Sequence, residues 1–453
     1  MGVTPHFNLI ERANRNDRYQ LLEDPSILSS DLDISIHSVF QASNFINTPP
    51  AIYQNMENAL RLASMFLQYD STIDWFVSPL FGLPLLDTQT NKTYLSDPLA
   101  SKTAAERRAL RQRVRVALDC MAHSVNFQFY TVNGNTGFWA RSLIDPTRRA
   151  SHNSVCCTPH FKVGTLVRID LRKQYWDFLN GDYASQSQPS RFRHEFSLAV
   201  SLIHEICHAV GILRRGNLEE PNLRLDHLPK SEFGYAWENF MFGCIINPFD
   251  RDSSSISFLM RKTWAENMQH PARRNKEWSA VPMSYISQWF RKSTWAKIAR
   301  RGPSAIALPA IKLKLRSLNG HLTLFADSKD AVDDVKRLRS ALAADRAAGW
   351  ELTPTEISVM LTRVIHATAP ELEATEIPLP SRHGPWYRDI EGSSAGYAMV
   401  RSVSDRSIPR LAIHEQGWKS TSALKRSAKQ DGDESSAACE QELLVRPTKR
   451  VKQ

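Results

Sequence analysis

Two histidines and a glutamate in this chain have the spacing of a metal site. His204, Glu205 and His208 form an H-E-x-x-H motif inside the apolar stretch 198–213. In a helix, residues four positions apart lie on one face, so the two imidazoles can bind the same ion. Glu205 would lie beside that ion, where a carboxylate can accept a proton from a metal-activated water. The motif therefore predicts a catalytic metal centre with Glu205 as general base.

Two histidines are not enough for such a centre, because a catalytic zinc site has three protein ligands and keeps one position for water. The candidates downstream of the motif are Asp226, His227, Glu232 and Glu238. Glu232 and Glu238 lie in an expected helix with small residues, which allow close approach to the motif helix. Six residues of helix place two side chains on different faces, so both cannot be ligands. We favour Glu232, with Glu238 as the alternative third ligand or as a partner of a ligand.

The order of these residues resembles that of the gluzincins, zinc peptidases with H-E-x-x-H on one helix and a glutamate ligand on the next. Segment 231–238, Ser-Glu-Phe-Gly-Tyr-Ala-Trp-Glu, resembles their Glu-Gly-x-Ala pattern with one residue inserted between Glu and Gly. It is also similar to uncharacterised fungal proteins with H-E-x-x-H … E-x-G-x-x-x-E. The resemblance implies a zincin metallopeptidase. It also implies Zn²⁺ held by His204, His208 and Glu232, and a peptide or protein substrate.

A helix must carry the motif, and its ends can be read from the residue types. Ser190 is expected to cap the start, and Gly216 is expected to end the helix after two arginines. Ser197, Ser201 and Gly211 fall near the histidine face, where small residues would leave room for a metal and a substrate.

Other elements follow from the apolar periodicity. Helices are expected over 52–67 and 104–121, and strands over 125–132 and 166–171. Together they predict an α+β fold: a predominantly helical zincin-like domain with a small sheet preceding the motif helix, plus a disordered C-terminal tail. An edge of such a sheet can bind an extended peptide.

Composition changes along the chain suggest four parts. Residues 1–48 are a mixed, partly ordered N-terminal segment, and 49–310 are the zincin-like metal-binding domain. Residues 311–400 are expected to form a helical extension. Residues 401–453 are expected to form a disordered basic tail, because apolar clusters are missing there.

The overall composition is that of a globular protein, with 42% hydrophobic and 23% charged residues and a net charge of +10. No nucleic-acid motif accompanies the charge, so it indicates a solvated basic surface. Neither a secretory signal nor an apolar run of membrane-spanning length is recognised. Six irregularly spaced cysteines favour a reducing compartment, so we expect an intracellular protein, cytoplasmic or nuclear.

Two other classes of function remain open. The first is a catalytically inactive zincin-fold protein that uses the groove to bind a peptide or partner. The second is a basic nuclear scaffold, suggested by the charge and by the Lys-Arg-Val-Lys sequence at 449–452.

Overall fold

The computed structural model describes residue 10 and most of 14–309, together with four short strands between 313 and 378. Within 14–309, the residues left undescribed are 88–90, 101, 131–137, 147–156, 158, 163, 182, 224–231, 249–255 and 263–276. The tail predicted for 401–453 lies outside the described residues.

The described residues form a mixed α/β fold with eight α-helices. These are α2 (Pro50–Phe66), α3 (Asp70–Phe81), α4 (Ala104–Cys120), α5 (Lys173–Asn180), α6 (Gln188–Arg215), α7 (Phe233–Phe242), α8 (Met283–Ser287) and α9 (Lys292–Arg301). The helices predicted for 52–67 and 104–121 are confirmed as α2 and α4.

A four-stranded mixed sheet precedes α6 in the chain. Its order is β1 (Phe45–Ile46), β4 (Val125–Tyr130), β6 (Val167–Arg172) and β5 (Ala140–Ile144). The pairs β1–β4 and β4–β6 are parallel, whereas β5 runs antiparallel to β6 and forms an edge. Buried and half-buried residues alternate along β4, the pattern of a strand with one face on the core. Both strands predicted from the sequence belong to this sheet.

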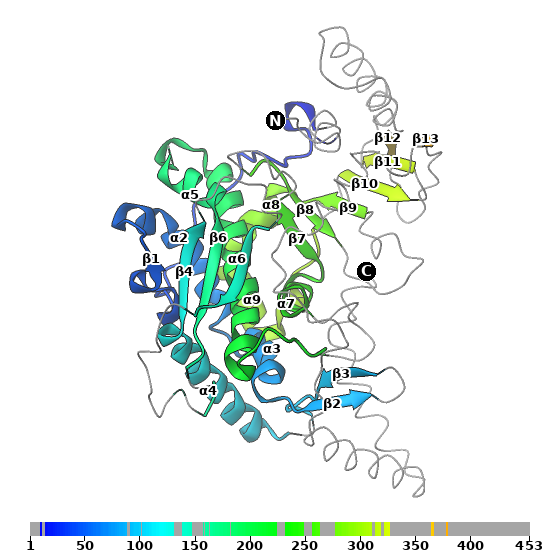
Figure 1. The fold of residues 1–453 in the computed structure, drawn as a ribbon. Helices are drawn as coiled ribbons and strands as arrows, with labels where there is room; N and C mark the ends of the chain where they lie inside the picture. Colours follow the sequence, from blue (N-terminus) through cyan, green and yellow to red (C-terminus); the bar gives the residue numbers. More distant parts are fainter. Residues whose placement is uncertain are drawn as a thin grey trace, which may run out of the picture.

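A second, larger sheet lies on the side of α7 away from the four-stranded sheet (Figure 1). It contains β7 (Ile245–Pro248), β8 (Leu259–Lys262), β9 (Glu277–Ala280), β10 (Leu313–Leu318), β11 (His321–Ala326), β12 (Val364–His366) and β13 (Ile377–Pro378). A separate hairpin joins β2 (Pro84–Asp87) to β3 (Lys92–Leu95). The described part of 311–400 consists of strands, and most of the helical extension expected there lies outside the described residues. Antiparallel pairing with β9 and β11 supplies the backbone hydrogen-bond partners of β10.

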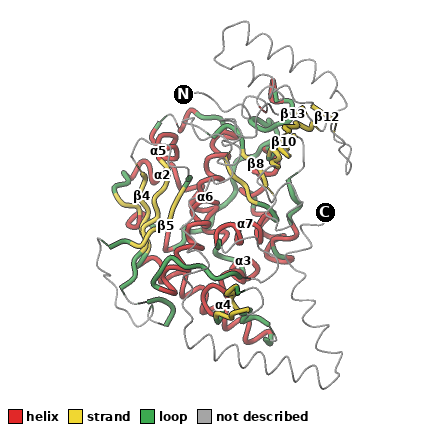
Figure 2. Tube along the Cα trace, turned by 45° about the vertical axis from the view of Figure 1, so that its right-hand side comes forward, coloured by secondary structure: helices red, strands yellow, loops and turns green. Residues whose placement is uncertain are grey.

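Helix α6 is the central element of the fold (Figures 1 and 2). It packs against β5 and β6 on one side and against α2, α3, α7 and α8 on others. Ser187, not the expected Ser190, caps its first turn, and Pro189 lies within that turn. Gly216 ends the helix as predicted, in the left-handed conformation that a glycine adopts without strain.

The length and apolar composition of α6 would suffice to cross a membrane, contrary to the sequence-based expectation that no run is long enough. Every residue of its most apolar window is buried inside the described fold. Burial on all sides is what the core helix of a globular protein requires.

An aromatic cluster fixes α7 against α2 and α9. The rings of Phe66 and Trp237 meet edge to face, with centroids 5.2 Å apart, and Phe66 contacts Trp295 in the same manner at 5.0 Å. Such aromatic pairs add about 0.5–1.5 kcal/mol each beyond the burial of their surface. Because α2 also packs against α6, the cluster helps to hold α7 in place beside α6.

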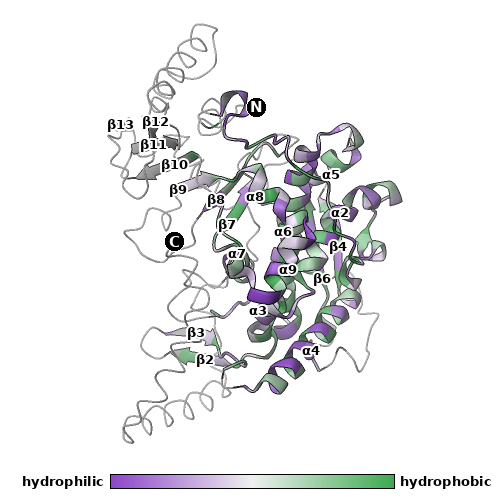
Figure 3. Ribbon diagram, turned by 180° about the vertical axis from the view of Figure 1, so that it is seen from behind, coloured by the Kyte–Doolittle hydropathy of each residue, from purple (hydrophilic) through white to green (hydrophobic). Residues whose placement is uncertain are grey.

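Helix α4 covers the outside of the fold and carries many hydrophilic residues (Figure 3). Arg111 and Arg115 of this helix form ion pairs with Asp70 and Asp74 at the start of α3. The arginine-rich face of α4 is thus a solvated surface that also ties two helices together.

Candidate metal centre

Helix α6 carries the three motif residues into the core. His204, Glu205 and His208 are all completely buried, and the two imidazole centroids lie 5.0 Å apart. Burying three ionisable side chains without compensation would be costly. Their surroundings therefore have to supply charge and hydrogen bonds.

Glu232 completes the group. It precedes α7 and caps it, with extended backbone angles (φ −161°, ψ 108°) and one carboxylate oxygen accepting from Tyr235 N. The other oxygen, Oε1, lies 3.1 Å from His204 Nε2 and 2.7 Å from His208 Nε2. His204, His208 and Glu232 form a buried group that could hold a metal ion, its three ligand atoms within 4.8 Å of one another.

Glu238 contacts the opposite side of the His204 ring. Its Oε1 accepts a hydrogen bond from Nδ1 of His204 at 2.8 Å, and its Oε2 accepts one from Ile246 N. The expected conflict between Glu232 and Glu238 does not arise, because α7 begins at Phe233 and Glu232 lies outside it. Glu232 is therefore in the position of the third ligand, and Glu238 in that of a ligand's partner.

Glu220 holds the second histidine in the same way, and our sequence analysis did not identify it. Its Oε1 accepts from His208 Nδ1 at 2.5 Å, and its Oε2 accepts from Phe233 N at 2.9 Å. Glu220 lies twelve residues beyond His208 in an irregular segment. No helical or strand periodicity there indicates which way its side chain points. The only sequence signal for Glu220 is that it is a glutamate between the motif and Glu232.

These hydrogen bonds fix the form of both imidazoles. The carboxylates can only accept, so we assign the proton of each neutral ring to Nδ1. In that neutral form each Nε2 presents a lone pair beside Oε1 of Glu232, and a bound cation would replace the protons that the rings otherwise hold there. Tetrahedral ligands about 2.0–2.1 Å from a zinc ion lie roughly 3.3 Å apart. The 3.1 Å from Glu232 Oε1 to His204 Nε2 is near that value, whereas the 2.7 Å to His208 Nε2 is shorter and would have to widen around an ion. The group therefore fits a small divalent cation.

The electrostatics lead to the same conclusion. Burial lowers the pKa of His204, yet the carboxylates of Glu232 and Glu238 more than offset it and raise that pKa to about 9. The pKa of His208 rises well above its usual value, against burial, because of Glu220 and Glu232. The cluster holds an excess of negative charge that attracts either protons or a cation to the two rings.

Glycine at position 234 allows α7 to lie directly on the first imidazole. A Cβ on Gly234 would overlap Cδ2, Nε2 and Cε1 of the His204 ring. An imidazole held at Nδ1 by Glu238 cannot move aside. Any larger residue at 234 would therefore displace either the ring or the helix.

Glu205 lies beside this group but makes different contacts. Its Oε2 accepts a hydrogen bond from Ser142 Oγ at 2.7 Å, whereas Oε1 has no hydrogen-bond partner among the described residues. Burial raises the pKa of Glu205 to about 6. A carboxylate of this pKa can accept and release a proton near neutral pH.

No known protein identifies this site. The chain matches none of the protein-family models, curated proteins or solved structures with which it was compared. The assignment of the centre therefore depends on its own geometry. Of the four candidates for the third ligand, Asp226 and His227 lie outside the described residues.

The small residues of α6 have other tasks than the one expected. Ser197 and Ser201 hydrogen-bond the buried hydroxyl of Tyr175, at 2.7 and 3.0 Å. Gly211 makes room for the ring of Phe233. The ring of Tyr235 lies edge to face with that of His204, with centroids 5.1 Å apart.

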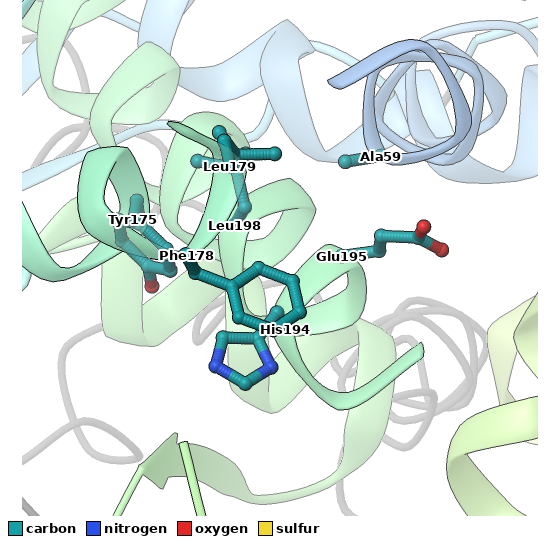
Figure 4. A pocket seen from close by; sticks show the side chains of 7 residues that line it. All are labelled: Ala59, Tyr175, Phe178, Leu179, His194, Glu195 and Leu198. Atoms are coloured by element: carbon teal, nitrogen blue, oxygen red, sulfur yellow. The ribbon is translucent and has the colours of Figure 1, made fainter. Parts of the chain in front are cut away.

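The N-terminal half of α6 carries a third histidine that is no part of the centre. His194 borders a cavity of about 10 Å³ and stacks on Phe178 (Figure 4). Its Nδ1 donates to Ser190 O at 2.8 Å, and its Nε2 accepts from Ile256 N at 2.7 Å. Burial lowers the pKa of His194 to about 3. This ring is a neutral structural link, in contrast with His204 and His208.

Proposed function

We propose that the protein is a zinc-dependent metallopeptidase with a zincin-like core. The observation that carries this proposal is the convergence of His204 Nε2, His208 Nε2 and Glu232 Oε1 beside a buried carboxylate. Two histidines and a glutamate are a ligand set of catalytic zinc sites, and a fourth position is then left for water and substrate. The resemblance to gluzincins supports the same metal.

A bound zinc ion supplies a water of lowered pKa and polarises the carbonyl to be attacked. Glu205 accepts the proton of the attacking water at Oε1, the oxygen that Ser142 leaves free. The protonated carboxyl then delivers that proton to the leaving amine. Glu238 and Glu220 accept the Nδ1 protons of His204 and His208, so the Nε2 atoms of the two rings would be the ones that hold the ion.

The sheet beside α6 suggests how a peptide substrate would lie. Strand β5 packs against α6 and forms an edge of the described sheet. A peptide in an extended conformation can add to such an edge through backbone hydrogen bonds. It would pass next to Glu205, because Ser142 of β5 contacts that residue. We therefore propose a peptide or an unfolded protein segment as substrate.

The test combines metal analysis with a single substitution. Protein purified without chelators should contain about one zinc per chain, as a single three-ligand site requires. Glu205→Gln should keep the zinc and lower hydrolysis of unfolded casein by about 10²–10⁴-fold, the usual contribution of a general base. Glu195→Gln is a matched control, because Glu195 is buried on the same helix and bonds Tyr183 and Asn58 instead. Zinc-free protein, or a fully active Glu205→Gln variant, would refute the proposal.

The burial of the motif favours a second candidate. His204, Glu205 and His208 have no exposed surface, as in a site where the ion links elements of the fold. In that case the protein binds zinc and a peptide partner without cleaving it. Stoichiometric zinc in a wild-type protein that leaves casein intact would select this candidate.

A further inference from the structure

The strand next to the motif helix contributes a hydroxyl to the general base. Ser142 lies in the middle of β5, is 1% exposed, and pairs with Ile169 of β6. Along β5, Ala140 and Ser142 are buried while Arg141 and Leu143 are partly exposed, so Ser142 faces α6. Its position is thus fixed by the sheet and does not depend on a flexible loop.

Ser142 contacts Glu205 at two atoms. Its Oγ lies 2.7 Å from Oε2 of the side chain and 3.1 Å from the backbone oxygen of the same residue. Both atoms are acceptors, and a hydroxyl has one proton to donate. The ionised carboxylate is the stronger acceptor and the closer one, so the hydrogen bond goes mainly to Oε2.

The two oxygens of Glu205 therefore differ. Oε2 is held by the strand, and Oε1 is buried with no hydrogen-bond partner among the described residues. A glutamate side chain without such a contact loses less rotational freedom and can turn either oxygen toward its neighbours. With Oε2 fixed, only Oε1 remains to receive a proton.

We propose that Ser142 is a positioning residue for the general base: it holds Oε2 of Glu205 so that Oε1 faces the attacking water. This assignment rests on the proposed function. It also means that β5, the strand proposed to align the substrate, positions the general base Glu205 as well. A purely structural serine that satisfies the backbone oxygen of Glu205 is the competing explanation.

The experiment distinguishes the effect of losing the Ser142 hydroxyl from the effect of changing the side-chain volume. Ser142→Thr and Ser142→Val have nearly the same shape, suit a strand, and differ in one hydroxyl group. Ser142→Ala removes the hydroxyl without adding volume. Ser197→Ala is the matched control, because it removes another buried hydroxyl near the motif, one that bonds Tyr175.

Zinc-loaded variants would be compared by steady-state hydrolysis of unfolded casein. We expect Ser142→Ala and Ser142→Val to lower kcat about tenfold or more, the effect of one hydrogen bond to a charged group, with KM within about twofold. Ser142→Thr should recover most of kcat, and Ser197→Ala should resemble the wild type. Equal kcat for the Thr and Val variants would overturn the inference, as would a change confined to KM.

A measurement without turnover distinguishes failure of this inference from failure of the proposed function. The visible absorption bands of the cobalt-substituted protein report on the metal's surroundings, and we would follow them with pH. If Ser142 positions Glu205, the Ala and Val variants shift this pH dependence, whereas the Thr and Ser197→Ala variants do not. Should the wild type cleave nothing, that shift still supports the assignment of Ser142. Identical spectra for all variants would refute it.

Discussion

Each imidazole of the centre is bounded by carboxylates at both nitrogens, and these carboxylates have different tasks. Glu232 faces both Nε2 atoms, whereas Glu238 and Glu220 each accept the Nδ1 proton of one ring. A carboxylate that holds the remote nitrogen of a metal-binding histidine fixes the ring and makes it a better donor. Loss of such a partner should weaken metal binding less than loss of a ligand.

Isosteric substitutions at Glu232 and Glu238, which contact the two nitrogens of His204, test this assignment. Glu238→Gln keeps an acceptor oxygen for Nδ1 but removes the charge, and should weaken zinc affinity by about 10–100-fold. Glu232→Gln replaces an anionic ligand and should weaken it further. Competition with a chromophoric chelator measures both affinities. A larger loss in Glu238→Gln than in Glu232→Gln would reverse the roles of the two residues.

At the scale of elements, α6 uses histidines in two opposite ways. Near its C-terminal half, carboxylates raise the pKa values of His204 and His208. In the N-terminal half of α6, burial keeps His194 neutral, and the nearby cation Arg193 acts in the same direction. The ring donates a hydrogen bond to Ser190 O and accepts one from Ile256 N. The second arrangement links α6 to the segment that leads into β8.

This link predicts a loss of stability in acid. His194 has a pKa of about 3 in the folded protein, below its usual value of 6.5. Its contribution is therefore fully present above pH 6.5 and is lost as the pH falls toward 3. Between pH 6 and 4 the free energy of unfolding should fall by about 1.4 kcal/mol per pH unit from this residue.

His194→Gln isolates that contribution from the other titrating groups. The variant should be less stable than the wild type at pH 7, and the difference should shrink as the pH is lowered to 4. Urea unfolding at several pH values gives both free energies. A difference that stays constant over this range would show that the pKa of His194 is the same in the folded and the unfolded protein.

At the scale of the whole molecule, the centre joins segments that are distant in the chain. Glu220 bonds both His208 and Phe233 N, and Glu238 bonds both His204 and Ile246 N. The motif helix, the start of α7 and strand β7 therefore meet around the group. Without a cation, four buried glutamates would surround two histidines. Buried negative charges that are not fully compensated lower the stability of the folded protein.

Zinc should consequently stabilise the folded protein. At a free zinc concentration of 100 times Kd, the expected gain is about 2.7 kcal/mol, and a chelator should lower Tm. Differential scanning calorimetry with and without zinc measures this difference. Glu232→Gln, with its weaker affinity, should respond only at higher zinc concentrations. A Tm that zinc leaves unchanged in the wild type would show that no ion binds the native state.

Several features of the chain were predictable because they depend on neighbours in sequence. The length of α6, its end at Gly216, and the placement of His204 and His208 on one face follow from helical periodicity. The helices α2 and α4 and the strands β4 and β6 follow from similar local patterns. Glu232, the favoured third ligand, lies with His204 and His208 in the buried group, but it does so from outside the helix that was expected to carry it.

The remaining features were decided by tertiary contacts. Helical periodicity could not show that Glu232 caps α7 from outside, or that Glu220 and Ser142 reach His208 and Glu205. The strands described between 313 and 378 were not predicted for a similar reason, because β9, which pairs with β10, lies in another part of the chain. Sequence by itself determined which residues could bind a metal and which helix carries them. The fold decided which carboxylate lies beside both histidines, the partners of each ring and which oxygen of Glu205 Ser142 contacts, because those contacts join residues that only folding brings together.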